Sequence, residues 1–301
     1  KNTIEVNKIN NLNIKLQNST KKVIIKVQDI IRKHSNNFNK IIIEYLIHLI
    51  LCNNKKCVKF IPKLYGMYKY KNKLLYLMDN LKGITFDEFL YKKNKNKYKS
   101  NYEDTLLNIL KQICLIINLF QKYFKFVHGD FKPNNIFLEK TTKKYINIDG
   151  IKLKTYGYIV KIIDYGFSCI SSNNNNIIVP THTYSPIICN KYFIDILFLY
   201  IKLIKKLNKT KYNIPSKLRN IIRTKIKKLF ILKNLKEVYS KNRSKKSESN
   251  ISIINYSSQK IEYKIIRDIS ILFNNYKNSP HLLQFHPLKM YELLEDYSNL
   301  Q

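Results

Sequence analysis

The sequence predicts an α+β fold in which a mainly β N-terminal part with one helix precedes a larger, mainly helical part. Two observations lead to this expectation. Short runs rich in Ile, Val and Tyr, separated by polar turns, fill most of residues 12–78. From residue 102 onward, longer segments with apolar residues at helical spacing replace them. The 301 residues suit one or two domains and can bury a sizeable core.

The N-terminal part is expected to contain two pairs of strands and one helix. The strands are predicted at residues 12–16, 22–27, 60–70 and 74–78. Polar turns at 17–21 and 71–73 separate the members of each pair. Between the pairs, apolar residues at helical spacing predict a helix over 39–51.

The rest of the chain is expected to be mostly helical. The predicted helices span residues 86–91, 102–123, 193–207, 217–235, 267–276 and 288–297. The segment 102–123 is the clearest amphipathic helix, and 193–207 is apolar enough to be buried. Polar residues at 92–101 predict a loop, and those at 240–252 a flexible connection.

The chain is strongly basic, with a net charge of +35. Nearly all of this charge is Lys, and only five residues are Arg, whereas phosphate and base recognition favour Arg. Abundant Asn, Ile and Tyr accompany the Lys, which indicates AT-rich coding as the main cause. A selected surface for nucleic acid or acidic membranes is the alternative. Non-specific binding to polyanions is expected in either case.

Cysteine spacing and hydropathy bear on the compartment. Five cysteines at irregular spacing form no disulfide framework, so free or buried thiols in a reducing compartment are expected. No run of 18 or more apolar residues indicates a membrane span, and no signal-peptide pattern begins the sequence.

The most informative segment is Phe126-Val-His-Gly-Asp-Phe-Lys-Pro-Asn-Asn-Ile-Phe137, followed downstream by Ile162-Ile-Asp-Tyr-Gly166. It contains His-x-Asp, then Lys two residues later and Asn five residues later, before a separate Asp-aromatic-Gly. Lys and Asn are too common in this chain to be informative. His, Asp, Pro and Gly are scarce, so His128, Asp130 and Gly166 matter most.

These two motifs resemble the catalytic and metal-binding loops of the eukaryotic-type protein kinase superfamily, serine/threonine kinases in particular. The resemblance covers roughly residues 12–205 and implies a two-lobed fold. It implies a small, mainly β N-lobe at residues 1–79 and a larger, mainly α C-lobe at 80–301. Residues 208–301 are assigned no role by it.

The resemblance implies transfer of the ATP γ-phosphate to a protein hydroxyl, with Mg²⁺ as cofactor. Asp130 is then the catalytic base or hydroxyl-orienting group, and Lys132 lies near the transferred phosphoryl group. Asn135 and Asp164 hold magnesium, because a hard cation prefers oxygen ligands. The pair Lys132-Pro133 is typical of serine/threonine rather than tyrosine kinases.

ATP binding is assigned to the N-terminal part and its boundary. Val23-Ile-Ile-Lys26 resembles the Val-Ala-Ile-Lys strand, so Lys26 is expected at the α/β-phosphates. Glu44, 18 residues later among apolar neighbours, needs a cationic partner, and Lys26 is the predicted one. Met78 matches the residue that gates the back pocket. The backbone of Asp79 and Leu81 is expected to bind adenine.

Three further residues have structural roles by the resemblance. His128 is expected to form hydrogen bonds within the catalytic loop. Asp195 matches the Asp that opens the central helix of the large lobe and holds the catalytic loop through backbone amides. An unpaired Asp in so apolar a helix is costly, which supports such a role. Thr181 matches a threonine that contacts the catalytic Asp.

The sequence departs from the kinase pattern at three places. None of its six glycines precedes Lys26, so the Gly-rich loop expected near residues 3–10 is missing or degenerate. Gly129 replaces the Arg that often precedes the catalytic Asp. The 34 residues from Asp130 to Asp164 exceed the usual gap, and an extra hairpin is expected near 141–158. This insertion is similar to kinase-like proteins of large cytoplasmic DNA viruses.

Two other functions remain open. The missing glycines favour a pseudokinase or a basic binding scaffold, and His-Gly-Asp at 128–130 also resembles small-molecule phosphotransferases. The leading hypothesis is a serine/threonine protein kinase acting on a protein substrate. A viral relative of this kind is expected in the host cytoplasm or the virion.

Overall fold

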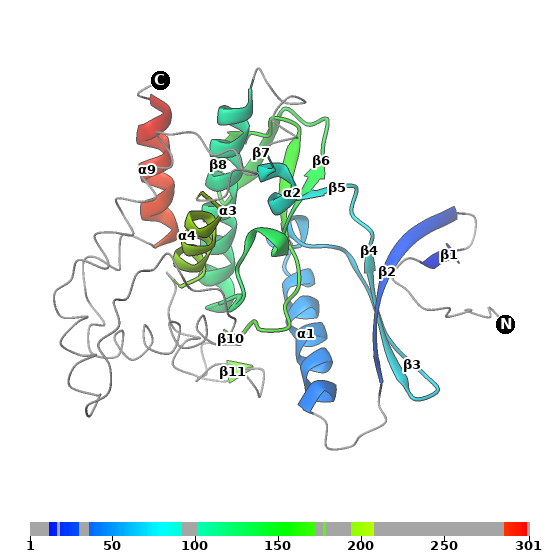
Figure 1. The fold of residues 1–301 in the computed structure, drawn as a ribbon. Helices are drawn as coiled ribbons and strands as arrows, with labels where there is room; N and C mark the ends of the chain where they lie inside the picture. The colour runs from blue at the N-terminus through cyan, green and yellow to red at the C-terminus, as the bar shows by residue number, and fades with distance from the viewer. Residues whose placement is uncertain are drawn as a thin grey trace, which may run out of the picture.

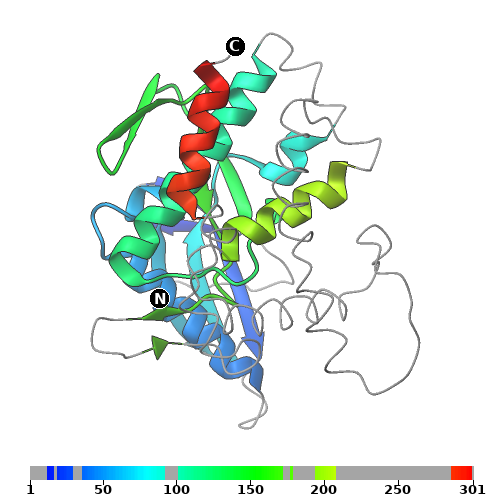
Figure 2. The same ribbon diagram turned by 90° about the vertical axis from the view of Figure 1, so that its left-hand side faces the viewer.

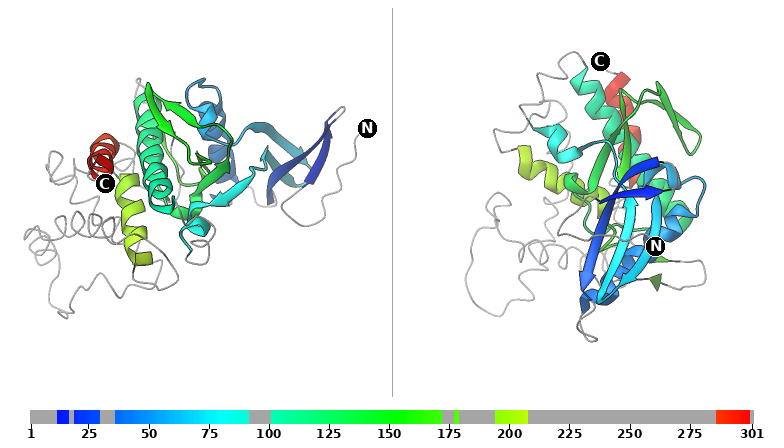
Figure 3. Two further views of the ribbon diagram at one scale, coloured as in Figure 1. Left: turned by 90° about the horizontal axis from the view of Figure 1, so that it is seen from above. Right: turned by 90° about the vertical axis from the view of Figure 1, so that its right-hand side faces the viewer.

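The computed structural model describes residues 12–16, 19–29, 36–91, 101–171, 177–178, 194–207 and 286–299. Within these ranges the chain has the α+β class that the sequence predicts. Figure 1 shows a sheet with one helix on one side of the molecule and a group of helices on the other. The view from above in Figure 3 shows the same separation.

A four-stranded antiparallel sheet is formed by the N-terminal part, in the order β1-β2-β4-β3. Its strands are β1 (Leu12–Leu16), β2 (Ser19–Asp29), β3 (Leu64–Tyr70) and β4 (Lys73–Asp79). All four predicted strands are confirmed, although β2 begins at Ser19, inside the predicted turn. The β3 strand begins four residues later than expected, because a short helical turn (Val58–Phe60) and Pro62 precede it.

The helix α1 (Asn36–Cys52) covers one face of this sheet and includes the whole predicted helix at residues 39–51. Alternation along β4 sends Leu74, Tyr76 and Met78 toward the α1 residue Ile41, where all four are buried. The intervening residues of β4 belong to a separate cluster on the other face of the sheet. Both faces of β4 are therefore buried, as its continuous apolar run indicates.

The main hydrophobic core surrounds the long helix α3 (Tyr102–Phe124), whose predicted bounds are confirmed to within one residue. Helices α4 (Ile194–Leu207) and α9 (Pro287–Asn299) pack around it, also close to their predicted ranges. Figure 2 shows α9 alongside α3, and Lys111 of α3 forms a 3.1 Å ion pair with Glu295 of α9. The helices predicted at 217–235 and 267–276 lie outside the described residues.

A second, three-stranded sheet supports the loops that carry the motif residues. Its order is β5-β6-β9, formed by β5 (Gly83–Thr85), β6 (Ile136–Lys140) and β9 (Tyr158–Ile162). The short helix α2 (Phe86–Leu90) follows β5 and begins with a capping box between Thr85 and Glu88. The sequence did not predict β5, because three residues show no periodicity. Gly83 is required there, since an added Cβ would lie 1.9 Å from the carbonyl oxygen of Leu138.

The expected extra hairpin is confirmed between β6 and β9. It consists of β7 (Tyr145–Ile148) and β8 (Ile151–Lys154), joined by Asp149 and Gly150 at φ 49° and 94°. Two positive φ values are what a type I′ turn requires, and Asp-Gly is a preferred pair for it. The N–H of Gly150 also donates to the Asn147 side chain at 2.9 Å.

Three further observations complete the fold. The short strands β10 (Ile170–Ser171) and β11 (Ile177–Ile178) pair without having been predicted. Cys52, Cys57 and Cys114 are free thiols, as expected. Cys169 is disulfide-bonded, so the expectation that the cysteines are free or buried thiols was wrong for this residue. No helix among the described residues is both long and apolar enough to cross a membrane.

Candidate active site

Three charged residues from separate elements meet where β2, α1 and the end of β9 come together. The ammonium of Lys26, on β2, donates hydrogen bonds to the carboxylates of Glu44 and Asp164. The distance from Lys26 Nζ to Asp164 Oδ1 is 3.0 Å. Glu44 lies on α1, with only 6% of its surface exposed. The predicted Lys26–Glu44 pair is present, and Asp164 is added to it.

The charges of this group stabilise one another. Burial opposes the charge of Lys26, but the carboxylates of Glu44 and Asp164 outweigh it and raise the pKa of the amine. Burial also opposes the charge of Asp164, yet the ammonium of Lys26 beside it holds the pKa of the carboxyl below its usual value. Both residues are therefore charged at neutral pH.

The backbone around Asp164 is held in a specific conformation. Asp164 is the second residue after β9 and has φ 68°, a left-handed conformation that Asp tolerates better than most residues. The preceding N–H, that of Ile163, donates to the Asn135 carbonyl at 3.1 Å. After it, the buried Tyr165 donates its hydroxyl to the carbonyl of Ile162 at 2.6 Å. The aromatic residue of the Asp-aromatic-Gly motif is thus both buried and hydrogen-bonded.

Asp130, Lys132 and Asn135 form a second polar group on the preceding loop. The carboxylate of Asp130 lies 2.5 Å from Lys132 Nζ and accepts a 3.1 Å hydrogen bond from Asn135 Nδ2. Asn135 Nδ2 also donates to the Asp130 carbonyl at 2.9 Å, which closes the loop. The short helical turn Pro133–Asn135 begins with Pro, whose fixed φ suits that position.

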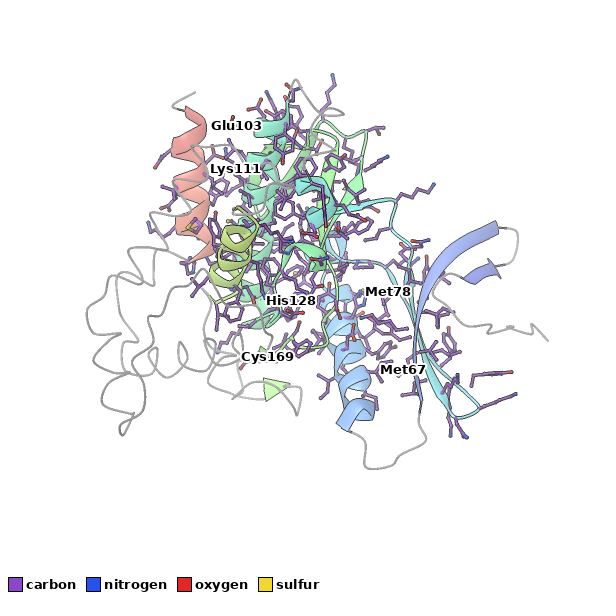
Figure 4. The ribbon with its side chains drawn as sticks, in the orientation of Figure 1. Met67, Met78, Glu103, Lys111, His128 and Cys169 are labelled. Carbon is purple, nitrogen blue, oxygen red and sulfur yellow. The ribbon has the colours of Figure 1, made fainter. Side chains whose placement is uncertain are left out.

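The two groups adjoin each other. His128 Nε2 is 3.0 Å from the carbonyl oxygen of Ile163, so the imidazole connects the Asp130 loop to the residue before Asp164. Electrostatic interactions with His128 and Lys132 also lower the pKa of Asp164, after the larger effect of Lys26. His128 itself is fully buried, consistent with a structural rather than catalytic position. Figure 4 shows it near the centre of the molecule.

Asp195 holds the start of the Asp130 loop. From the first turn of α4, its fully buried carboxylate accepts hydrogen bonds from the N–H groups of His128 at 2.8 Å and Gly129 at 3.1 Å. Burial raises the pKa of this carboxyl, against the lowering effect of His128 and of the two backbone donors. The structure thus places Asp195 where the resemblance put it, on backbone amides of the loop.

Gly129 departs from the kinase pattern for a reason that the structure gives. Its φ is +77°, and an added Cβ would lie 2.3 Å from the carbonyl oxygen of Phe167. An Arg at this position would be both strained and obstructed. The close approach of the two loops, reinforced by a 3.0 Å hydrogen bond from Ser168 Oγ to the His128 carbonyl, excludes larger residues.

The residues expected to contact adenine lie at the end of β4 and just beyond it. Met78 is buried and packs with Ile24 between the sheet and α1, and Figure 4 labels it on this strand. The N–H of Asp79 donates to the Lys63 carbonyl at 2.9 Å, so it can serve a nucleotide only by breaking that bond. Leu81 is half-buried. Thr181 lies outside the described residues, so its expected contact with Asp130 stays a prediction.

His48 was missed by sequence reasoning. It lies one helical turn after Glu44 on α1, and its Nε2 donates to the Pro62 carbonyl at 2.7 Å, while Nδ1 accepts from the Tyr76 hydroxyl. Its ring centre lies 5.1 Å from that of Tyr165. Burial lowers the pKa of His48 to about 4, so it is neutral at pH 7. The available signal was a scarce residue four positions after Glu44, on the same helix face.

Gln112 was missed as well. This fully buried residue of α3 accepts from the N–H of Val160 at 2.9 Å and donates to the carbonyl of Tyr158 at 3.1 Å. The Gln112 amide thus forms hydrogen bonds with the β9 backbone in the way that a neighbouring strand would, and β9 ends two residues before Asp164. A Gln on the apolar face of a predicted helix was the signal that could have found it.

The donor set fits a magnesium ion. Asp164 supplies carboxylate oxygens and Asn135 an amide oxygen, and the two residues belong to loops joined by the Ile163–Asn135 hydrogen bond. Oxygen ligands from one or two protein side chains, completed by phosphates and water, are typical of magnesium in phosphoryl-transfer enzymes. Among the described residues, no cluster of three or more His, Cys, Asp or Glu side chains could hold a metal.

Comparisons with known proteins leave the family open. No protein-family model matches the chain. It is 39% identical over 66 residues to the uncharacterized protein ZK177.2 of Caenorhabditis elegans, which covers 21% of the chain and 22% of that protein. It is 28% identical over 115 residues to the uncharacterized protein 098R of Invertebrate iridescent virus 6, which covers 34% of the chain and 19% of that protein. The matches thus span about a fifth of each relative.

Proposed function

We propose that this chain is an ATP- and Mg²⁺-dependent serine/threonine protein kinase with a two-lobed, kinase-type fold. The observation that carries the proposal is the contact of Lys26 with both Glu44 and Asp164. Phosphoryl transfer in protein kinases needs a lysine held by a Glu and a metal-binding Asp, both in place at the phosphates. Three residues from distant segments meet in that combination, which supports the proposal more than any single motif does.

Each residue has a role in the proposed reaction. Asp130 orients the acceptor hydroxyl and accepts its proton as the oxygen attacks the γ-phosphorus and the bond to the leaving ADP breaks. Lys132, which lies 2.5 Å from Asp130, neutralises charge on the transferred group. Lys26 moves from Asp164 to the phosphates of ATP, while Glu44 keeps its position. Bound magnesium, held by Asp164 and Asn135, would supply neutralisation of the phosphate charges.

The supporting elements are consistent with this proposal. A four-stranded sheet with one packed helix carries Lys26 and Glu44, while the larger helical part carries the remaining site residues. Asp195 fixes the backbone of the Asp130 loop. The sequence segment Lys132-Pro133 favours a serine or threonine acceptor in a protein.

The proposal is tested by transfer of labelled phosphate from ATP to a basic and an acidic protein substrate, with magnesium and with a chelator. Asp130→Asn and Asp164→Asn are each expected to lower transfer at least about 100-fold. Asp104→Asn, an exposed change in the first turn of α3, is the matched control and should leave transfer unchanged. Undiminished transfer by both site variants would contradict the proposal.

A catalytically inactive relative is the second candidate, favoured by one observation. No glycine precedes Gly66 in this sequence, so residues 1–65 do not supply a Gly-rich loop to cover the phosphates. Thermal unfolding with and without Mg-ATP separates the two candidates, because a ligand that binds the folded state raises its stability. Absence of stabilisation by Mg-ATP would favour the inactive relative, and stabilisation together with phosphate transfer would favour the kinase.

A further inference from the structure

The hairpin β7–β8 has one buried and one exposed face. Ile148 and Leu153 are buried in the main core, where the hairpin packs against α3. Tyr145, Lys152 and Lys154 are exposed, and the register pairs Tyr145 directly with Lys154. Alternation along both strands therefore produces an outer face of tyrosine and lysine. Figure 2 shows the hairpin extending from the body of the molecule.

The turn of the hairpin is fixed to its neighbours by ionic contacts. The carboxylate of Asp149 lies 2.8 Å from Lys122, in the last turn of α3, and 4.0 Å from Lys56, in the turn after α1. Lys59 donates to the Asn147 carbonyl at 2.6 Å. These contacts make the hairpin, the end of α3 and the turn after α1 one continuous surface.

Lysine ammonium groups lie over exposed tyrosine rings on this surface. Lys56 Nζ is 5.3 Å and Lys122 Nζ 5.9 Å from the centre of the Tyr123 ring. On the hairpin, Lys152 Nζ is 4.5 Å from the centre of the Tyr145 ring. Tyr123 and Tyr145 remain 37% and 47% exposed, so their rings are accessible to a ligand. The surface thus combines positive charge with aromatic faces.

We infer that this surface binds single-stranded nucleic acid. It comprises six residues, hereafter the lysine–tyrosine surface: Lys56, Lys122, Tyr123, Tyr145, Lys152 and Lys154. Exposed aromatic rings stack on unpaired bases while adjacent cations follow the phosphate backbone, and neither interaction requires a particular base sequence. This activity is independent of phosphoryl transfer, because none of the six residues belongs to the candidate active site.

Other anionic partners fit the surface less well. An acidic peptide offers carboxylates to the lysines, but it makes no use of the exposed tyrosine faces. A membrane surface would require apolar side chains to insert between lipids, whereas the outer face of the hairpin carries tyrosine and lysine. Double-stranded nucleic acid keeps its bases stacked and hidden from the two rings.

The inference is tested by fluorescence anisotropy of a labelled oligo-dT titrated with the full chain in the absence of ATP. The variant Tyr145→Ala/Lys152→Ala/Lys154→Ala removes exposed side chains only and is expected to weaken binding at least about 10-fold. Loss of two phosphate contacts should also reduce the slope of log K against log salt by about 1.4.

The matched control is Tyr68→Ala/Lys69→Ala/Lys71→Asn, in β3 and the turn that joins it to β4. It removes the same residue types and the same charge from another exposed hairpin, and Asn tolerates the positive φ of 50° at position 71. Less than about 2-fold weakening is expected there.

Equal losses in both variants would overturn the inference, since net charge alone would then explain binding. It would also be overturned if poly-glutamate or anionic vesicles competed with oligo-dT as well as unlabelled oligo-dT does. Retention of phosphate transfer by the hairpin variant, together with lost oligo-dT binding, supports the inference. Failure of the proposed kinase activity would leave the binding result unaffected.

Discussion

Lys26 and Asp164 are 138 residues apart in the chain, yet the ammonium of one lies 3.0 Å from the carboxylate of the other. This ion pair joins the four-stranded sheet to the loop after β9. It also places the residue expected to bind phosphates against the residue expected to bind magnesium. Because Glu44 contacts the same ammonium, a change at any of the three alters the charge that the other two experience.

Removal of the charge of Glu44 should weaken ATP binding. In Glu44→Gln, Lys26 loses the carboxylate of Glu44 and keeps the contact with Asp164. Because Lys26 is then held less firmly at the phosphates, we expect a KM for ATP about 10-fold higher. The free energy of unfolding should fall by about 1–2 kcal/mol, less than for a fully buried pair, because the Lys26 side chain is 35% exposed. Steady-state kinetics and urea denaturation measure the two effects. The control Glu139→Gln removes a partner of Lys161, at 3.3 Å, and a rise in KM of equal size there would contradict this interpretation.

Removal of the Asp195 carboxylate should lower the stability of the folded protein. Asp195→Ala leaves the buried N–H groups of His128 and Gly129 without this acceptor, and we expect a loss of about 2–4 kcal/mol in urea denaturation. Asp195→Asn keeps one carbonyl oxygen and should lose less. The idea fails if the two variants are equally stable and both match the unsubstituted chain.

His48 should make stability depend on pH in the weakly acidic range. Its pKa is about 4 in the folded protein, against about 6.5 when unfolded, so the unfolded chain binds more protons between these values. The contribution of neutral His48 is complete above pH 6.5 and is lost as the pH falls toward 4. We expect about 2 kcal/mol less stability at pH 4.5 than at pH 7 from this group.

Thermal unfolding of the unsubstituted chain and of His48→Gln over this range isolates the effect, since Gln does not titrate. Carboxylates such as Asp164 are present in both proteins and contribute equally to the pH dependence of each. The stability that comes from a lowered carboxyl pKa is lost only as the pH falls below the usual carboxyl range. Parallel curves for the two proteins would exclude His48 as the source.

Gln112 should protect the amide of Val160 from exchange with solvent. In Gln112→Met the side-chain volume is similar but the buried N–H of Val160 loses its acceptor, at a cost of about 1–3 kcal/mol. Native-state hydrogen exchange should then be faster at Val160 than in the control Asn118→Ala, a half-buried change on the same helix. Unchanged exchange at Val160 would show that Gln112 does not fix β9.

The sequence predicted most elements that depend on local pattern. The strands of the first sheet, helices α1 and α3, and the β7–β8 hairpin follow from periodicity, turn residues and an unusual gap length. The three-residue strand β5 was missed because its pairing with β6 depends on the close approach at Gly83, which no local signal reveals. The disulfide bond of Cys169 was missed because irregular cysteine spacing does not indicate pairing.

The candidate site, too, was predicted only in part. The sequence singled out a few scarce residues among the many Lys and Asn, because an acid or a His among apolar neighbours requires a partner. These residues are Glu44, His128, Asp130, Asp164 and Asp195. The roles assigned to them rest on a resemblance and remain to be tested. His48 and Gln112 were overlooked, because each shows its purpose only through partners on other elements.

The sequence by itself determined the α+β class, the order of the main elements and the residues with special chemistry, because these depend on spacing within short segments. Only the tertiary structure decided that Lys26 reaches Asp164 as well as Glu44, and that Asp195 holds the Asp130 loop. It alone joined lysines and tyrosines from three segments into one surface. Contacts between residues far apart in sequence depend on how helices and sheets pack, and that packing minimises exposed apolar area and unpaired buried charge over the whole chain at once.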